Sequence, residues 1–370
     1  MGLTLIYTSL LALASNAVAQ KCPIVFDGRV PDGTTPSLFD TEASPFNTEY
    51  VKGKEVAFSE LIKIPDVPTS LFDAPEKSEA IEVTISDLSI FAPSPDNVQV
   101  GFRRAELQVD GNNGTDSSTI GVKTLHFSVR KDPARPFNNS HEYQLVWLED
   151  NSYSTNQIVL KTGYIWPPTG LDPDTLVLFG NVNSKPVPQL FNTSFTEDVW
   201  HNFGVTMDFT ASTTTVYYST DSDPLALVNG PVANDVSGQG QFHFGPLKKP
   251  TGEGIKDVTK EGYQSPGIDE GVIFGAIFME DSEGDCVSLS PDGSSTQSYN
   301  AVPAPTEEKS YQPTTPPTKE KTEEKTGEKT GGKTGGETGE KTGEKYKQKS
   351  EKKYEEKSEE KGEKKTECDS

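Results

Sequence analysis

The fold follows from one kind of sequence stretch, of which Gly101-Phe-Arg-Arg-Ala-Glu-Leu-Gln-Val109 is the clearest example. Successive side chains of a β-strand point to opposite faces, so residues two apart share a side. As a strand, this stretch has Arg104 and Glu106 on one face and Ala105 and Leu107 on the other. The pattern predicts a strand with one apolar face and one face of guanidinium and carboxylate groups.

A second stretch, Ser140-His-Glu-Tyr-Gln-Leu-Val-Trp147, alternates in the same way. Strict alternation places Glu142 and Gln144 on a polar face, opposite Tyr143 and Trp147. Glutamate and amide groups therefore recur in phase, where an ordinary solvated strand has Lys, Thr or Ser.

Two further stretches add histidines to polar faces. His126 opposes the apolar side chains of Thr124–Val129, and His243 opposes those of Gln241–Phe244. If all four strands lie in one antiparallel sheet, their polar faces line a single wet concavity, as in polysaccharide-cleaving proteins. The alternative is an ordinary sheet with a solvated outer face. The pattern alone leaves the choice open.

Strand-like runs rich in Val, Thr, Phe and Tyr extend from about residue 20 to residue 291. Turn signals such as Asp110-Gly-Asn-Asn-Gly114 separate them, and no long stretch has the 3.6-residue period of a helix. We therefore predict one all-β domain over residues 20–291. Its expected architecture is a β-jelly roll, that is, a two-sheet antiparallel sandwich.

The two ends of the chain differ from this domain. Residues 1–19 contain an apolar run and end in Ala17-Val-Ala19, which is typical of a signal-peptide cleavage site. A membrane anchor is the alternative, but the run is shorter than the roughly twenty residues that a spanning helix needs. Residues 292–318 are predicted to be a Ser/Thr/Pro-rich linker, and residues 319–370 a disordered Lys/Glu/Thr/Gly tail. We expect a secreted, extracellular protein.

Export permits disulfides, and the chain has three cysteines. We predict that Cys22 pairs with Cys286, since these two bracket the domain, while pairings with Cys368 stay open on sequence alone. Three Asn-x-Ser/Thr motifs are expected to be N-glycosylation sites on surface loops: Asn113, Asn138 and Asn192.

The net charge restricts the class of partner. It is −22 at pH 7, and nearly all of the excess negative charge belongs to the domain, because Lys and Glu almost balance in the tail. An acidic body repels polyanions such as nucleic acid, anionic lipid and polyuronates, whereas a neutral polysaccharide meets no such repulsion. We expect no nucleic-acid or membrane partner, and we expect a monomer.

Six motifs occur in order along the chain: Asp27-Gly-Arg, Ser44-Pro-Phe-Asn, Tyr50-Val-Lys-Gly, Gly101-Phe-Arg-Arg-Ala-Glu, Gly121-Val-Lys-Thr-Leu-His-Phe-Ser and Ser140-His-Glu-Tyr-Gln-Leu-Val-Trp. Together they resemble glycoside hydrolase family 131, fungal secreted β-glucanases with a β-jelly-roll fold. The resemblance runs from about Cys22 to Cys286. It implies action on β-1,3-, β-1,6- and β-1,4-linked glucans, catalytic carboxylates at Glu106 and Glu142, and a cleft histidine at His243.

Glycoside hydrolysis needs one carboxylic acid to protonate the leaving oxygen and one carboxylate to attack or to activate water. We predict that Glu106 and Glu142 fill these roles, in either assignment. The alternative for Glu106 is a structural salt bridge with Arg104. The side chains expected to orient a carboxylate or to bind sugar are Arg104, His126, Gln144 and His243. No catalytic-metal or cofactor motif occurs, so we predict neither, while a structural Ca²⁺ at an Asp-rich loop such as Asp221-Ser-Asp223 stays open.

Two other functions stay open. One is a polysaccharide lyase of jelly-roll type, whose candidate residues would be Arg104, His126, Tyr143 and Gln144; the acidic body disfavours its polyanionic substrate. The other is a non-catalytic glucan-binding wall protein. Four loop aromatics are candidates for sugar subsites, although burial preferences favour partly buried, structural positions for them: Tyr153, Tyr164, Trp166 and Tyr263.

Overall fold

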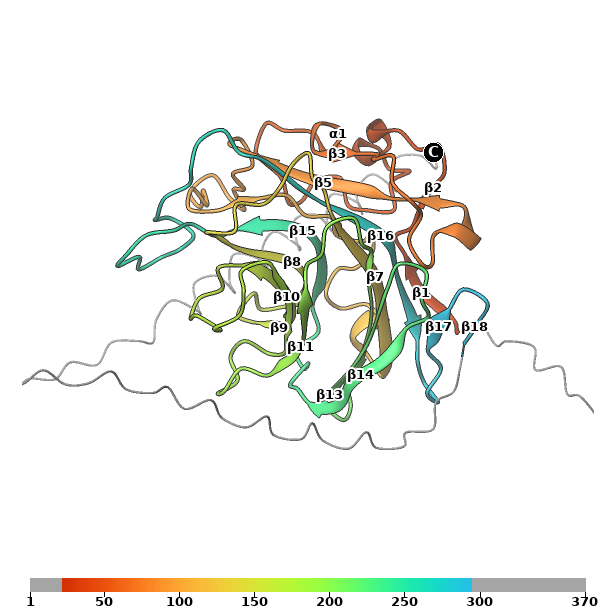
Figure 1. Ribbon diagram of the computed structural model, residues 1–370. Helices are drawn as coiled ribbons and strands as arrows, with labels where there is room; N and C mark the ends of the chain where they lie inside the picture. The colour runs from red at the N-terminus through yellow and green to blue at the C-terminus, as the bar shows by residue number, and fades with distance from the viewer. Residues whose placement is uncertain (1–21, 295–370) are drawn as a thin grey trace, which may run out of the picture. The chain divides into compact units, whose positions relative to one another are not determined.

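The computed structural model describes residues 22–294, which form two antiparallel β-sheets that enclose a common core (Figure 1). The first sheet has eight strands. Seven follow in the order β14 (Ala226–Ala233), β13 (Thr213–Thr220), β12 (His201–Asp208), β7 (Val122–Lys131), β16 (Asp269–Asp281), β5 (Ile81–Ser86) and β3 (Ile62–Lys63). The eighth, β1 (Ile24–Asp27), pairs with β16.

The second sheet has six strands, in the order β11 (Gln189–Ser194), β10 (Thr175–Phe179), β9 (Asn156–Gly163), β8 (Glu142–Glu149), β15 (Gln241–Lys248) and β6 (Arg103–Arg104). Two small ladders complete the strands: β2 (Val30–Pro31) with β4 (Ser78–Glu79), and β17 (Ser288–Ser290) with β18 (Gly293–Ser294). The described helices are short: α1 (Phe58–Leu61) and the 3₁₀ turns η1 (Pro36–Asp40), η2 (Ala74–Glu76) and η3 (Ser117–Thr119).

The core lies between the two sheets, where alternate residues of each strand meet. Leu125 and Phe127 of β7 enter it from the eight-stranded sheet, and Phe242 and Phe244 of β15 enter it from the six-stranded sheet. We call the opposite side of the six-stranded sheet the outer face. By strand pairing and alternation, its residues include Arg104, Glu106, Glu142, Gln144, Trp147, Glu149, Lys161, His243 and Lys249.

The predicted fold class, an all-β two-sheet sandwich, is confirmed. The predicted signal segment (1–19), the tail (319–370) and almost all of the linker (292–318) lie outside the described residues. None of the helices in the described part of the chain is long and apolar enough to cross a membrane.

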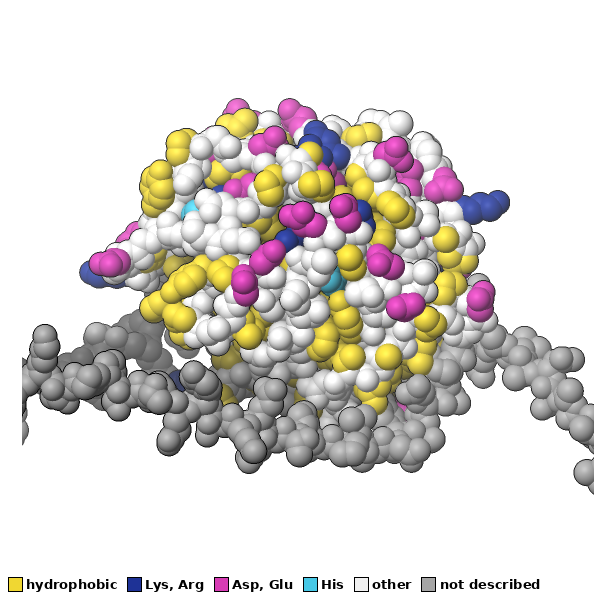
Figure 2. All heavy atoms as spheres, viewed as in Figure 1, with side chains coloured by type: hydrophobic (Ala, Val, Ile, Leu, Met, Phe, Trp, Pro, Cys, Tyr) yellow, Lys and Arg dark blue, Asp and Glu magenta, His cyan; other side chains and the backbone are white. Residues whose placement is uncertain are grey.

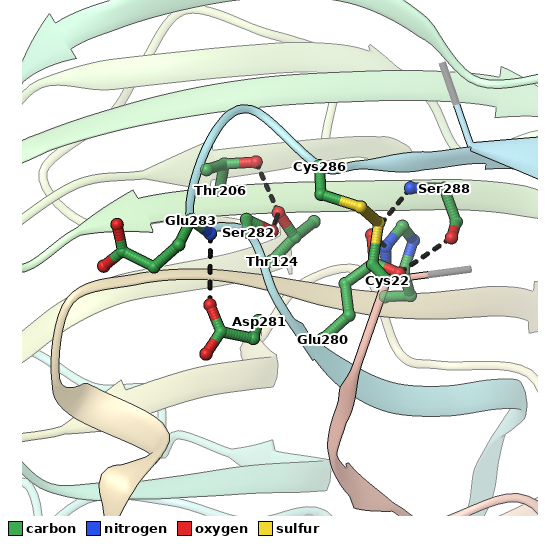
Figure 3. Close-up of a disulfide and its surroundings, with 10 residues drawn as sticks. Cys22, Thr124, Thr206, Glu280, Asp281, Ser282, Glu283, Cys286 and Ser288 are labelled. Carbon is green, nitrogen blue, oxygen red and sulfur yellow. Dashed lines mark hydrogen bonds and ion pairs between the residues drawn. A yellow bond between two sulfur atoms is a disulfide. The ribbon is translucent and has the colours of Figure 1, made fainter. Parts of the chain in front are cut away.

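Cys22 and Cys286 form a disulfide, as predicted (Figure 3). The bridge joins Cys22, two residues before the start of β1, to Cys286 in the loop that follows β16. Beside it, the buried carboxylate of Glu280 accepts hydrogen bonds from the backbone nitrogen and the hydroxyl of Ser288, at 2.7 Å and 2.8 Å. These contacts tie the C-terminal hairpin of the described domain to the eight-stranded sheet.

Candidate active site

Glu106 is enclosed in the outer face by an ion pair with Arg104. Arg104 is the last residue of β6, and Glu106 follows two residues later, so the two side chains point to the same side of the sheet. Arg104 Nε donates to Glu106 Oε1 at 2.5 Å, and Nη2 donates to Oε2 at 2.7 Å. Glu106 is fully buried. The salt bridge that the sequence allows is therefore present, and any catalytic role of Glu106 has to operate with it.

His243 connects Glu106 to a second carboxyl group, that of Glu149. His243 Nδ1 lies 2.9 Å from Glu106 Oε2, and Nε2 lies 3.5 Å from Glu149 Oε2. Trp147 stacks on the imidazole, with ring centroids 4.7 Å apart. The two carboxyl groups therefore contact the two different nitrogens of one imidazole ring.

The pKa values of these two carboxyl groups shift in opposite directions. Burial opposes ionisation of Glu106, but the charge and hydrogen bonds of Arg104 and His243 outweigh it and hold the pKa of Glu106 below its usual range. Burial raises the pKa of Glu149, against the opposing charge of His243, and the carboxylate of Glu106 adds to the rise. The Glu149 side chain is 27 % exposed. The site thus combines an ionised, enclosed carboxylate with a more readily protonated, accessible one, which suits acid–base chemistry.

Strict alternation along β8 predicts the wrong face for Trp147, and for the same reason it does not predict that Glu149 lies on the outer face. The register of β8 against β9 shifts between Gln144 and Val146, which inserts an extra residue and reverses the phase of the strand. Trp147 and Glu149 therefore share the outer face with Gln144. The sequence signal of this bulge is the pair Leu145-Val146, because both side chains lie in the core and strict alternation would place them on opposite faces.

Glu142 begins β8 on the same face but belongs to a separate charge cluster. Its Oε1 lies 2.7 Å from the ammonium groups of both Lys161 and Lys249. Its Oε2 accepts a hydrogen bond from the backbone nitrogen of Trp166 at 3.0 Å. Burial would raise the pKa of Glu142, but the charges of the two lysines outweigh it and lower that pKa. Strand β15 separates β8 from the segment of Glu106, so the backbones of the two glutamates are at least two inter-strand spacings, about 10 Å, apart across the sheet.

Gln144 lies on the outer face and accepts a hydrogen bond from Asn156 at 3.1 Å, but His126 lies elsewhere. His126 is on β7 in the eight-stranded sheet, where its Nε2 is 2.9 Å from Glu280 Oε1 and its ring stacks on Phe278. The condition that all four stretches share one sheet is therefore not met for β7, which pairs with β12 and β16. Alternation determines which residues share a face, but not which sheet a strand joins.

The loop aromatics are more exposed than burial preferences predict. Trp166 is 70 % exposed. The other three are exposed as well: Tyr153, Tyr164 and Tyr263. An exposed aromatic ring can stack on a sugar, because a pyranose presents a flat apolar face.

The remaining predicted sites are on the surface. The acceptor asparagines Asn113, Asn138 and Asn192 are exposed, and their glycosylation stays a prediction. Within residues 22–294, no group of three or more His, Cys, Asp or Glu side chains is arranged to hold a metal ion. Figure 2 shows acidic side chains spread over the visible face, with fewer basic ones, in keeping with the net charge.

Comparison with known proteins extends these observations to a family. The glycoside hydrolase 131 catalytic N-terminal domain matches residues 24–285. The crystal structure of a GH131 β-glucanase catalytic domain from Podospora anserina is 21 % identical, with a TM-score of 0.55, and the alignment covers 73 % of this chain and 99 % of that one. The catalytic domain of the family 131 protein from Coprinopsis cinerea is 22 % identical, with a TM-score of 0.52, and the alignment covers 72 % of this chain and 97 % of that one. A comparison with curated proteins finds no significant match. The match over residues 24–285 shows that the chain belongs to glycoside hydrolase family 131.

Proposed function

We propose that this glycoside hydrolase cleaves β-glucans at the outer face, with β-1,3, β-1,6 and β-1,4 linkages as the candidate bonds. Family membership and the likeness to the β-glucanase from Podospora anserina support the substrate class. The observation that carries the location of the site is the chain of contacts from Glu106 through His243 to Glu149.

In this proposal Glu149 is the general acid. Arg104 and Glu106 neutralise each other, and His243 contacts Glu106 through Nδ1 and faces Glu149 through Nε2. The raised pKa of Glu149 favours its protonated form, which a general acid requires. Of the three contacting residues Glu106, His243 and Glu149, Glu149 is the most exposed, so it can reach a glycosidic oxygen.

Glu106 is the ionised member of the pair. Because Glu106 is enclosed, its carboxylate cannot contact the substrate directly. We assign it two roles that act through the imidazole of His243: it orients the ring, and it balances positive charge that develops on the substrate. Glu142, the other glutamate that the family resemblance indicates, is bound by two lysines and has a lowered pKa. The geometry therefore favours Glu149 over Glu142 as the second catalytic carboxyl group.

We further propose that the enzyme acts outside the cell as a monomer. The signal-like residues 1–19 and the disulfide between Cys22 and Cys286 support export. The acidic surface supports a neutral polymer as the partner, and not nucleic acid or an anionic membrane.

The lyase alternative receives little support from the geometry. Tyr143 points into the core, where its hydroxyl donates to Glu270 at 2.7 Å, and His126 lies in the other sheet. Neither can therefore act together with Arg104 on the outer face. The glucan-binding alternative uses the same surface without turnover.

One product analysis separates these functions. Purified full-length protein is incubated with laminarin, pustulan and a soluble β-1,4-glucan, and products are resolved by chromatography with ultraviolet and reducing-end detection. Hydrolysis gives new reducing ends without ultraviolet-absorbing products. Unsaturated products would support the lyase instead, and binding without any released sugar would support the non-catalytic protein.

A further inference from the structure

Trp166 presents its indole to solvent from a backbone that is firmly attached to the outer face. The side chain is 70 % exposed. Its own backbone nitrogen donates to Glu142 Oε2 at 3.0 Å, and the preceding residue, Ile165, is buried. Two residues earlier, the backbone nitrogen of Tyr164 donates to the carbonyl of His141 at 2.9 Å. Tryptophan is enriched at binding interfaces, and a fixed backbone holds this exposed indole in place without further loss of conformational freedom.

The attachment point is a buried ion cluster that the proposed chemistry does not use. Glu142 is almost completely buried, and it is bound by Lys161 and Lys249, each at 2.7 Å. Lys161 is itself nearly buried, with its ammonium group 5.6 Å from the ring centre of Phe179. Removing three charged groups from water is costly unless they satisfy each other. The cluster therefore fixes the position of Glu142, and Glu142 in turn fixes the backbone of Trp166.

The position of Trp166 relative to Glu149 suits a polymer. Glu142 and Glu149 are the first and last residues of β8, and both lie on the outer face. The seven steps between them span roughly 20 Å at about 3.3 Å per residue. That length corresponds to several sugar rings. A glucan whose scissile bond is at Glu149 and which runs along β8 would reach Trp166 only if it is longer than a few units.

We propose that Trp166 is a distal sugar-stacking platform for the glucan chain and that Glu142 is the positioning residue that holds it. This inference rests on the proposed β-glucanase function. It gives the enzyme a preference for long chains over short oligosaccharides. It also assigns Glu142 a role in binding the polymer, at a distance from the reacting bond.

The test compares substrates of different length. The full chain is prepared as wild type, Trp166→Ala, Trp166→Phe, Glu142→Ala and the double Ala variant. Ile120→Ala is the matched control, since Ile120 is also exposed (55 %) but precedes β7 in the other sheet. The measured quantity is kcat/KM on a glucan hexasaccharide divided by kcat/KM on the trisaccharide of the same linkage. Thermal melting verifies that each variant is folded.

Trp166→Ala should lower this ratio about ten-fold, which is the effect of losing roughly half the burial of a large ring, and mainly through KM. Trp166→Phe should restore part of the ratio. Glu142→Ala should lower the ratio in the same direction, and the double variant should be no worse than Trp166→Ala. Ile120→Ala should leave the ratio at the wild-type value.

An unchanged ratio in Trp166→Ala, or an equal loss on both substrates, would overturn the platform. Additive losses in the double variant would overturn the positioning role of Glu142. If the wild type releases no sugar from any glucan, the proposed function fails separately. Electrophoretic retardation in a laminarin gel then tests the platform: weaker retardation of Trp166→Ala than of wild type supports it, and equal retardation overturns it.

Discussion

Replacing Glu82 by Gln should change how the stability of the protein depends on pH. Glu82 lies on β5, is fully buried, and accepts a hydrogen bond from Arg135 Nε at 2.7 Å. Arg135 Nη2 also lies 2.5 Å from Asp132 Oδ2, so one positive charge serves two carboxyl groups. Burial, together with the hydrogen bond and charge of Asp132, raises the pKa of Glu82 to about 7, against the opposing effect of Arg135.

The sign of the effect follows from proton uptake on folding. The folded pKa of Glu82 is about 7, above the value of about 4.3 expected in the unfolded chain, so the folded state binds a proton that the unfolded state has lost. The contribution of Glu82 to the free energy of unfolding is complete below about pH 4 and is lost as the pH rises through about 7. At 1.36 kcal/mol per pKa unit, a difference of about 2.7 units gives a loss of at most about 3.7 kcal/mol, and proton sharing with Asp132 makes it smaller.

The assay is urea unfolding of wild type and Glu82→Gln at pH 5, 6.5 and 8. A Gln side chain cannot ionise, so the stability of the variant relative to wild type should rise by up to about 3 kcal/mol between pH 5 and pH 8. Burial lowers the pKa of His141 and of His201, and these groups contribute the opposite slope, because the unfolded chain binds their protons more readily. They are present in both proteins and cancel in the difference. A difference that stays constant from pH 5 to pH 8 would refute the reasoning.

Three further predictions concern the rest of the chain. Replacing Cys22 and Cys286 together by Ala should lower the melting temperature, since the bridge joins residues 264 apart and such a loop contributes up to about 5 kcal/mol in the chain-entropy model; an unchanged melting temperature would contradict this. Ending the chain after Ala301 should leave hydrolysis of a soluble glucan within about two-fold of wild type, because all residues of the proposed site precede it, and a loss of most activity would place the tail in the site. The profile of kcat/KM against pH should be bell-shaped, and its alkaline limb should lie above the usual carboxyl range because the pKa of Glu149 is raised. Glu149→Gln should remove that limb, and an unchanged limb in the variant would exclude Glu149 as the acid.

The two-sheet fold and the faces of most strands could be predicted from alternation. Ala105 and Leu107 lie in the core, and Arg104 and Glu106 lie on the opposite side, as the sequence predicts. The length of the strand could not be predicted. Only Arg103–Arg104 forms ladder pairs as β6, because further along the backbone of Glu106 bonds instead to Val51, and Leu107 pairs with Phe244 as an isolated bridge. These partners are remote in sequence and leave no local signal.

The candidate site was only partly accessible from the sequence for two physical reasons. A bulge in β8 reverses the phase after Gln144, so a period-two pattern misassigns Trp147 and misses Glu149. Sheet membership depends on long-range pairing, so in-phase histidines do not show that they share a site, and His126 lies apart from His243. Arg104 and His243, which the sequence places on the polar faces of their strands as residues expected to orient a carboxylate, do contact Glu106.

The most direct test of the central claim compares three single substitutions, Glu106→Gln, Glu149→Gln and Glu142→Gln, on one soluble β-glucan. Each keeps the shape of the side chain and removes the ionisable group, and circular dichroism verifies that the β-sandwich is retained. We predict that kcat falls by about 10²-fold or more for Glu149→Gln, as loss of the general acid requires. We predict a comparable fall for Glu106→Gln, because it removes the carboxylate that orients His243. For Glu142→Gln we predict a small change in kcat and a larger rise in KM on the polymer. Near-native kcat in Glu149→Gln, together with loss of turnover in Glu142→Gln, would contradict the account and would assign the second catalytic carboxyl group to Glu142.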